Sequence, residues 1–400
     1  MGERLSIGLL THSVLPRGGV VHTLELAGAL ARRGHAVTVM APAEPGQLMF
    51  RSPGGPGAPV DVALLPTDAI HGTLVEQVRL RIDAIARGLP PVLARGGFDL
   101  LHVHDSLGGN ALADLADSGH ALPPWLRTIH HLDDFTEPRL NEWQARAWSS
   151  AGAIACVSDT WCHRMQQHHG RAPQRLHNGV DLARFRPQGE AGDAAALRSL
   201  GLRAGFVCLA VGGVEHRKNS HRLLQAFARI RAADPAWADA QLVMAGGASL
   251  LDHGEAQGRW AAALSDLGWS EGPKQPVWRT GPLPDALLPA LMRRARVLAM
   301  PSLMEGFGLV AIEALACGTP VLVSRRAPFT EHLAGEAQVA WCDPEDIDSI
   351  AAGLQAAARL PRAATPPPVC LAHGWDGSAE RHEDWYRAAL ATAGRGHPEH

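Results

Sequence analysis

Residues 300–335, MPSLMEGFGLVAIEALACGTPVLVSRRAPFTEHLAG, decide the fold that the sequence predicts. A short apolar strand at Arg296–Met300 runs into a turn that contains Glu305-Gly306-Phe307-Gly308. The spacing of apolar residues then predicts a helix from Leu309 and a second strand at Pro320–Ser324. Strand, turn, helix and strand form one unit of a parallel α/β sheet, and ligands bind such sheets at the turns that follow strands. We therefore expect the functional site at this turn.

The turn suits a phosphate group with sugar hydroxyls beside it. Its glycines, Gly306 and Gly308, let the backbone come close to a ligand, and the first amides of the following helix are unpaired and partly positive. Glu305 lies before the helix and Glu313 inside it; carboxylates are poor phosphate ligands but good acceptors for hydroxyl groups. The competing interpretation is that Glu305 caps the helix and that Glu313 is a solvated surface residue.

The composition is that of a globular protein with small-molecule partners. Four hundred residues predict about two or three domains, and a hydrophobic content of 46% is sufficient for packed cores. The net charge of -3 and the pI near 6.7 indicate no basic face for nucleic acid. Lysine occurs only at Lys218 and Lys274. A lysine within a motif therefore indicates a function more strongly here than it would in a chain rich in lysine.

Neither secretion nor membrane insertion is indicated. The six cysteines are scattered without a C-x-x-C pair, which favours reduced thiols in a cytoplasmic protein. The apolar run at the N-terminus ends at Thr11 and is too short for a signal peptide. No apolar stretch reaches the roughly 18 residues of a membrane span. We expect a cytoplasmic protein, and the sequence leaves a peripheral membrane contact open.

The first part of the chain alternates between strands and helices, which predicts a doubly wound domain. The expected strands are Leu5–Leu10, His35–Met40, Asp61–Leu65, Phe98–Val103, Leu126–Ile129 and Ala153–Val157. The expected helices are Val20–Arg33, Thr73–Arg87, Gly109–Asp117, Asn141–Ser149 and Asp159–His169. The breaker-rich segment Arg51–Pro59 is expected to be a loop.

A second α/β alternation follows Arg175–Pro187, RLHNGVDLARFRP, where an Asn-Gly turn and an Asp cap mark the change of domain. The expected strands are Phe206–Val211, Gln241–Ala245 and Val277–Thr280, followed by the two strands of the opening stretch. The expected helices are Ser220–Ala232, Glu255–Leu267, Pro284–Ala295, Ile347–Leu360 and a last amphipathic helix at Ser378–Thr392.

Common nucleotide motifs are absent. Gly18 and Gly19 follow the first strand, where glycine is also the expected structural punctuation, and they do not belong to a G-x-G-x-x-G motif. A nicotinamide-binding site would need that third glycine and an acidic residue after the second strand. A Walker A motif is absent too, which argues against a P-loop NTPase.

The 21 histidines suggest a metal site only as pairs: His102 with His104, His130 with His131, and His168 with His169. None has the H-E-x-x-H pattern or a carboxylate at ligand spacing on a predicted helix. We therefore expect no metal site. Asp346-x-Asp348 opens a helix, so capping is its expected role.

Three further residues have the chemistry to contact a sugar nucleotide. His130 ends a predicted strand, and a histidine there can donate to a sugar hydroxyl or a leaving phosphate, although an isolated histidine at a strand end is more often structural. Arg217 and Lys218 lie in the loop of VGGVEHRKN. They can neutralise a diphosphate leaving group; a solvated surface loop would have the same composition.

These segments resemble one enzyme family. EGFGLVAIEALACGTPVLVS is similar to the signature of the retaining glycosyltransferases of family 4, with its two glutamates separated by seven residues. Six further segments occur in the order of that family: PRGGVVHTLELAGALARRGHAVTV, FDLLHVHD, RTIHH, NGVDLARFRP, VGGVEHRKN and TGPLPDALLPALMRRA. The pairing of RTIHHLDDF with VGGVEHRKN also resembles a poorly characterised bacterial subgroup of the family.

The resemblance implies a GT-B fold, in which two Rossmann-like doubly wound domains face each other across a cleft and a C-terminal helix crosses back to the first domain. We accordingly expect an acceptor-side domain at residues 1–175, a nucleotide-sugar donor domain at 176–376 and the crossing helix at 377–400. The implied reaction moves a sugar, with retention, from a UDP-, GDP- or ADP-sugar to a hydroxyl of a glycan, a lipid-linked acceptor or a small molecule. No cofactor and no essential metal ion are implied.

The same resemblance assigns the site residues. Catalysis would involve His130, Arg217, Lys218 and Glu305. Contacts to the donor would come from Gly18, Gly19, Gly306, Phe307, Gly308, Leu309 and Glu313, with Glu305 at the sugar, the loop glycines near the diphosphate and Glu313 at the ribose. Gly213 departs from the family pattern, which has an arginine there, and we expect Arg217 to replace that arginine. Two alternatives stay open: a sugar-nucleotide epimerase of the same architecture, and an inactive regulator that binds nucleotide sugars.

Overall fold

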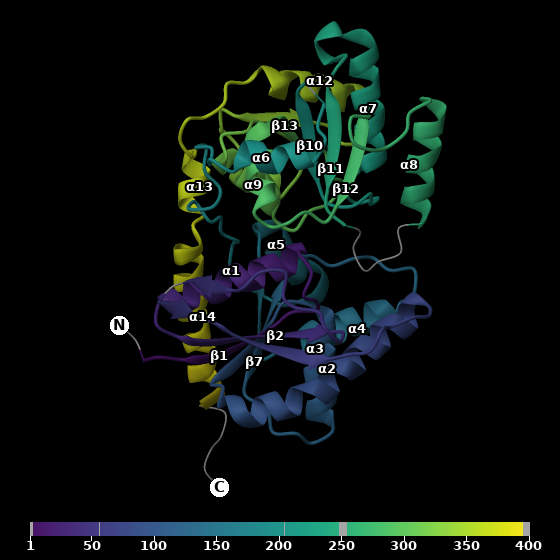
Figure 1. Ribbon diagram of the computed structural model, residues 1–400. Coiled ribbons are helices and arrows are strands. Elements are labelled where there is room, and N and C mark those ends of the chain that lie inside the picture. Colours follow the sequence, from purple (N-terminus) through teal and green to yellow (C-terminus); the bar gives the residue numbers. More distant parts are fainter. Residues whose placement is uncertain (1–2, 56, 204, 248–253, 395–400) are drawn as a thin grey trace. The chain divides into compact units, whose positions relative to one another are not determined.

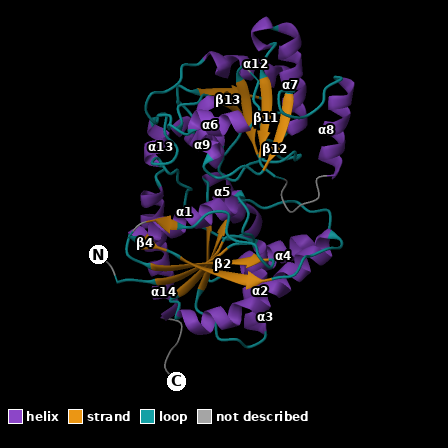
Figure 2. Ribbon diagram, viewed as in Figure 1, coloured by secondary structure: helices purple, strands orange, loops and turns teal. Residues whose placement is uncertain are grey.

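The computed structural model describes residues 3–55, 57–203, 205–247 and 254–394 (Figure 1). The chain forms two compact units, Met1–Gly179 together with Trp375–His400, and Val180–Gly374, called here the first and second units. Each unit contains a parallel sheet flanked by helices (Figure 2). This confirms the expected pair of Rossmann-like α/β domains. Among the described residues, no helix is both long enough and apolar enough to cross a membrane.

The sheet of the first unit has the strand order β5-β2-β1-β6-β7-β8-β9, and all neighbouring strands are parallel. These strands are β1 (Ser6–Leu10), β2 (Ala36–Ala43), β5 (Asp61–Pro66), β6 (Leu100–Val103), β7 (Trp125–Ile129), β8 (Ala153–Cys156) and β9 (Gln174–Arg175). The helices are α1 (Gly18–Arg32), α2 (Leu74–Gly96), α3 (Ser106–Asp117), α4 (Pro138–Ser149), α5 (Asp159–His169) and α14 (Trp375–Gly394). The order reverses between β1 and β6, the point at which doubly wound sheets bind ligands.

The second unit repeats this topology with the order β12-β11-β10-β13-β14-β15, again entirely parallel. Its strands are β10 (Val207–Val211), β11 (Gln241–Ala245), β12 (Val277–Gly281), β13 (Ala295–Met300), β14 (Val321–Ser324) and β15 (Val339–Cys342). Its helices are α6 (Asp193–Ser199), α7 (Ser220–Ala233), the 3-10 helix η1 (Pro235–Trp237), α8 (Gly254–Asp266), α9 (Leu287–Arg294), α10 (Leu309–Ala316), α11 (Phe329–His332), α12 (Ile347–Arg359) and α13 (Pro368–Ala372).

Three sequence predictions need correction. The segment Arg51–Pro59 is not only a loop, since Gly54–Gly55 (β3) pairs with Ala58–Pro59 (β4) in a short antiparallel hairpin beside α1. Helix α2 does not end at Arg87 but continues through Pro90 and Pro91 to Gly96, where Gly97 adopts the left-handed conformation (φ 53°) that ends many helices. The helix expected at Pro284–Ala295 is shorter, because Ala295 already begins β13.

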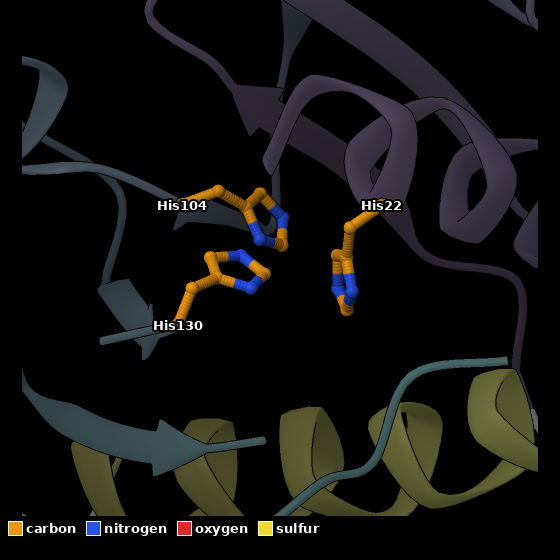
Figure 3. Close-up of side chains that lie close together, drawn as sticks. All are labelled: His22, His104 and His130. Carbon is orange, nitrogen blue, oxygen red and sulfur yellow. The ribbon is translucent and has the colours of Figure 1, made fainter. Parts of the chain in front are cut away.

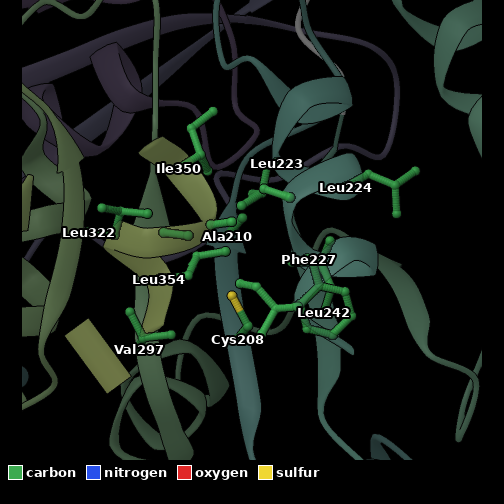
Figure 4. Close-up of a cluster of buried hydrophobic side chains, with 14 of the residues drawn as sticks. Cys208, Ala210, Leu223, Leu224, Phe227, Leu242, Val297, Leu322, Ile350 and Leu354 are labelled. Carbon is green, nitrogen blue, oxygen red and sulfur yellow. The ribbon is translucent and has the colours of Figure 1, made fainter. Parts of the chain in front are cut away.

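The core of the second unit lies between its sheet and the helices α7 and α12 (Figure 4). Leu223 and Phe227 of α7 and Leu354 of α12 are fully buried against strand residues such as Cys208 and Leu242. Burial of such large apolar side chains contributes about 1.5–3 kcal/mol each. Asp346 caps α12 as predicted, since its carboxylate accepts the amide proton of Asp348 at 2.9 Å.

The C-terminal helix α14 belongs to the first unit and packs beside α1 (Figure 1). Trp375 and Tyr386 enter the same hydrophobic core as the strands of that unit. The Tyr386 hydroxyl lies 2.7 Å from Nδ1 of His102 on β6, and both side chains are fully buried. The expected return of the C-terminal helix to the first domain is confirmed.

Replacing Tyr386 with phenylalanine should lower the free energy of unfolding by about 1–3 kcal/mol, because the buried His102 Nδ1 would lose its hydrogen-bond partner. Urea denaturation measures the difference. Asp384→Ala, an exposed position on the same helix, is the matched control and should change the stability little. Equal stability of Tyr386→Phe and wild type would show that this hydrogen bond does not hold the helix.

Candidate functional site

The turn after β13 places a buried carboxylate beside two cations. Glu305 is 9% exposed, and its Oε1 accepts hydrogen bonds from Lys218 Nζ at 2.7 Å and from the Ser302 hydroxyl at 2.8 Å. Arg217 lies 3.4 Å from the other oxygen, Oε2, and also pairs with the buried Glu215 at 3.1 Å. The structure therefore brings together three predicted catalytic residues, Arg217, Lys218 and Glu305.

The cations keep Glu305 ionised. Burial by itself would raise the pKa of this carboxyl group, but the charges of Lys218 and Arg217 and the hydrogen bonds of Lys218 and Ser302 lower the pKa to about 2. A buried carboxylate that lost these partners would be strongly disfavoured. The cluster is therefore a preformed set of charges at neutral pH, in which the two cations are only partly exposed.

Backbone geometry fixes the glycine turn. Gly308 is the N-cap of α10 and has φ 86°, a left-handed conformation that suits glycine. A side chain at this position would also collide with the ring of Phe329. Phe307 is buried and stacks on His332 with ring centroids 4.6 Å apart. Gly306, Gly308 and the first residue of α10, Leu309, can thus present backbone to a ligand, whereas the Phe307 side chain packs internally.

Both competing interpretations of the glutamates are wrong. The N-cap residue of α10 is Gly308 and no side chain caps this helix, so Glu305 is not its cap. Glu313 lies on the second turn of α10 and is only 6% exposed, so it is not a solvated surface residue. Two buried carboxylates in one short segment favour a role in binding or catalysis, since Asp and Glu are seldom buried in a folded protein.

A cavity of about 380 Å³ opens at the ends of three neighbouring strands of the second unit. It is lined by Gly213, Val214, Gly246, Gly247, Gln257, Glu271, Gly272, Trp278, Arg279 and Gly281. Apart from Gly213, these residues were not predicted from the sequence. A glycine at the carboxyl end of each strand was the available signal, because these ends of parallel strands meet at one edge of a sheet: Gly212 follows β10, Gly246 follows β11 and Gly281 ends β12.

The Gly213 departure is explained in part by this geometry. Gly213 borders the cavity, and the preceding Gly212 has φ 126° with the Lys218 side chain passing close to it. Arg217 follows in the same loop and reaches the carboxylate of Glu305. The loop therefore supplies an arginine to the cluster although position 213 has none.

The remaining predicted residues lie in the first unit. Gly18 and Gly19 begin α1, and a side chain added at Gly19 would lie 3.9 Å from the His130 ring. His130 directly follows β7; its burial, and then the neighbouring charges, lower its pKa to about 3, so the ring is neutral at pH 7. The structure thus places Gly19 and His130 together.

The histidine pairs considered from the sequence do not supply pairs of available ring nitrogens for a metal. His102 uses both ring nitrogens, one with Tyr386 and the other with the Thr128 hydroxyl at 2.8 Å. His168 and His169 are exposed and their ring centroids lie 6.5 Å apart. His104 and His130 instead lie in one cluster with His22, a residue that sequence analysis did not single out.

Comparison with known proteins gives consistent results for both units. The model of "Glycosyltransferase Family 4" matches residues 16–184, and that of "Glycosyl transferases group 1" matches residues 202–365. A "D-inositol 3-phosphate glycosyltransferase" of Kribbella flavida is 30% identical over 404 residues, which cover 94% of this chain and 92% of that protein.

Solved structures confirm the fold. Sucrose-phosphate synthase from Thermosynechococcus elongatus superposes with a TM-score of 0.75 at 22% identity, over 97% of this chain and 100% of that one. Anabaena HepE in complex with UDP and glucose gives a TM-score of 0.68 at 17% identity, over 96% and 100% of the two chains. With both family models and the near full-length relative in agreement, this chain is a GT-B glycosyltransferase that belongs to family 4.

Proposed function

We propose that the enzyme transfers a sugar, with retention of configuration, from a nucleotide-sugar donor to an acceptor hydroxyl. The observation that carries this proposal is the cluster of Glu305, Lys218 and Arg217 at the glycine turn before α10. Such a cluster offers cations to a diphosphate and a carboxylate to a sugar in one place. The name of the Kribbella relative supports a polyol-type small-molecule acceptor, and the UDP bound to HepE supports a nucleoside diphosphate on the donor side.

In the proposed mechanism the bond between the anomeric carbon and the diphosphate oxygen breaks, and the electron pair leaves with the diphosphate. Lys218, Arg217 and the first amides of α10 near Gly308 stabilise the negative charge that develops. The acceptor hydroxyl attacks from the face of departure, and the leaving phosphate takes its proton. Neither a metal ion nor a protein nucleophile is required for these steps.

The other site residues hold the donor in place. Glu305 accepts from hydroxyls of the donor sugar and Glu313 from those of the ribose. The cavity beside Gly213 and Gly246 takes the base, since about 380 Å³ is within the size range of small-molecule sites. His130, neutral at pH 7, donates to a sugar hydroxyl through Nδ1, which leaves its Nε2 unprotonated.

Nucleotide release from a panel of UDP-, GDP- and ADP-sugars, with and without inositol phosphate and crude glycan or lipid acceptors, tests the activity. A transferase should release nucleoside diphosphate in an acceptor-dependent manner and retain the anomeric configuration in the product. Conversion of the donor without an acceptor would instead identify an epimerase. Binding of a nucleotide sugar without any turnover would identify a regulator.

Arg217→Ala and Lys218→Ala should each lower kcat by about a hundredfold, because each removes a charge-assisted donor to the leaving group, a loss of about 3 kcal/mol. Lys218→Ala should also lower stability, since the buried Glu305 would lose the ammonium group that lies 2.7 Å from its Oε1. Arg229→Ala is the matched control, because this exposed arginine pairs with Asp348 in the same unit. Wild-type kinetics in Arg217→Ala would make Arg217 a structural partner of Glu215 and end its assignment as the replacement for an arginine at position 213.

Glu305→Gln should reveal the ion pairs through the pH dependence of stability. A carboxyl pKa lowered from 4.5 to about 2 by folding stabilises the folded state by about 3 kcal/mol above pH 4.5. That stabilisation is lost as the pH falls from 4.5 towards 2. In this range the carboxyl group is already protonated in the unfolded state and still ionised in the folded state, so acid favours unfolding. The variant should therefore be less stable than wild type at pH 7, and the difference should shrink on acidification. Urea denaturation across this range measures the difference, with Glu345→Gln at an exposed position as the control. A difference that did not change with pH would show that the Glu305 charge does not stabilise the fold.

A further inference from the structure

Three imidazole rings converge in the first unit, away from the glycine turn in sequence (Figure 3). His22 comes from α1, His104 follows β6 and His130 follows β7. The ligand atoms that they offer all lie within 4.8 Å of one another. The ring centroids are 4.9 Å apart for His22 and His104, 4.7 Å for His22 and His130, and 5.7 Å for His104 and His130.

These rings contain buried nitrogens that have no hydrogen-bond partner among the described residues. They are Nε2 of His22, Nε2 of His130 and both ring nitrogens of His104. His22 is fully buried and His104 is 5% exposed. Buried polar atoms are nearly always satisfied, and a native site with several unsatisfied ones calls for an unseen water or ion. Here the unsatisfied nitrogens belong to rings that lie around one point (Figure 3).

The hydrogen bond of His22 suits metal binding. Nδ1 of His22 lies 2.8 Å from Oδ1 of Asn178; because an amide oxygen can only accept, Nδ1 carries the proton and Nε2 keeps its lone pair. Metal-bound histidines characteristically donate their second nitrogen to such a partner.

The neighbouring His102 shows what a structural histidine looks like in the same place. Its ring centroid lies 4.1 Å from that of His104, yet Tyr386 and Thr128 satisfy both of its nitrogens. A buried cluster built for packing alone would be expected to satisfy all of its rings in this way. His22, His104 and His130 each keep at least one buried nitrogen without a partner among the described residues, and this distinguishes them from His102 by chemistry and not only by proximity.

We propose that His22, His104 and His130 bind a divalent transition-metal ion of the Zn²⁺ class. In a tetrahedral site with metal–nitrogen bonds of about 2.0–2.1 Å, the ligand nitrogens lie roughly 3.4 Å from one another. Small rotations of the three rings would bring their nitrogens from the present spacing to this distance. Imidazole ligands suit Zn²⁺, Co²⁺ and Ni²⁺, and not Mg²⁺ or Ca²⁺, which require oxygen. Three protein ligands leave one position open to water or a hydroxyl group.

The experiment uses the full chain without a polyhistidine tag, stripped with a chelator and titrated with Co²⁺ followed by Zn²⁺. Wild type should take up one tight equivalent of Co²⁺ with the intense visible d–d absorption of four-coordinate cobalt, and Zn²⁺ should displace it. His104→Gln should abolish this uptake. Asn178→Ala leaves all three ligands in place and should weaken the affinity by about 10- to 100-fold, the usual effect of removing a partner of a ligand.

Two controls separate this site from adventitious binding by other histidines. His102→Gln removes a buried neighbour that is already satisfied, and His168→Gln with His169→Gln removes an exposed pair; both should retain the tight equivalent. Far-UV circular dichroism verifies that each variant is folded, and a rise in the Tm of wild type with Zn²⁺ gives a measurement that needs no variant. Absence of a tight equivalent in wild type, or its retention in folded His104→Gln, would overturn the proposal. Neither result depends on whether the enzyme transfers a sugar.

Discussion

The second unit has to stabilise the buried, ionised carboxylate of Glu305. A charge that is removed from water must be paired and hydrogen-bonded, and its partners come from two loops that follow different strands. Lys218 and Arg217 belong to the loop after β10, and Ser302 to the turn after β13. The amide of Leu303 also donates to the Arg217 carbonyl at 2.9 Å, so backbone and side chains join the same two loops. Strands β10 and β13 are neighbours in the sheet, and this adjacency makes the pairing possible.

The backbone of this turn is held rigidly, and its amides are nevertheless available to a ligand. Gly308 needs its left-handed conformation to start α10 directly after the turn, and Phe329 closes the space where a side chain would be. The stacked Phe307 and His332 support the turn from inside. A ligand at this turn therefore meets amides and charges that are positioned before it arrives, which reduces the reorganisation needed during a reaction.

Sequence reasoning was successful where local pattern determines structure. Alternating strands and helices gave nearly every element of both sheets, and the spacing of apolar residues gave the start of α10 at Leu309. Burial of Glu313 was not predictable from a helical position alone, because it depends on packing by distant segments. The short strand β15 was not predicted.

The histidine cluster was missed for a topological reason. A search for metal sites by spacing considers residues near one another in sequence, whereas His22, His104 and His130 meet because β6 and β7 are neighbours and α1 lies over the same strand ends. Histidines directly after two consecutive strands, in FDLLHVHD and RTIHH, were the available signal. Because the carboxyl ends of parallel strands meet at one edge of a sheet, these histidines could have been predicted to lie close together. The same rule does not predict that His22 lies beside them.

Because α14 belongs to the first unit, that unit is made of two segments that are translated at different times. The core of that unit includes Trp375, Ala379 and Tyr386, which are translated only after the whole of the second unit. Domains generally fold as units, and the N-terminal one usually folds first. In this chain the second unit is continuous from Val180 to Gly374 and can complete its core during elongation. Most of the first unit is translated earlier, but its core lacks the residues of α14 until the second unit has been synthesised, so its sheet stays incompletely covered during that interval.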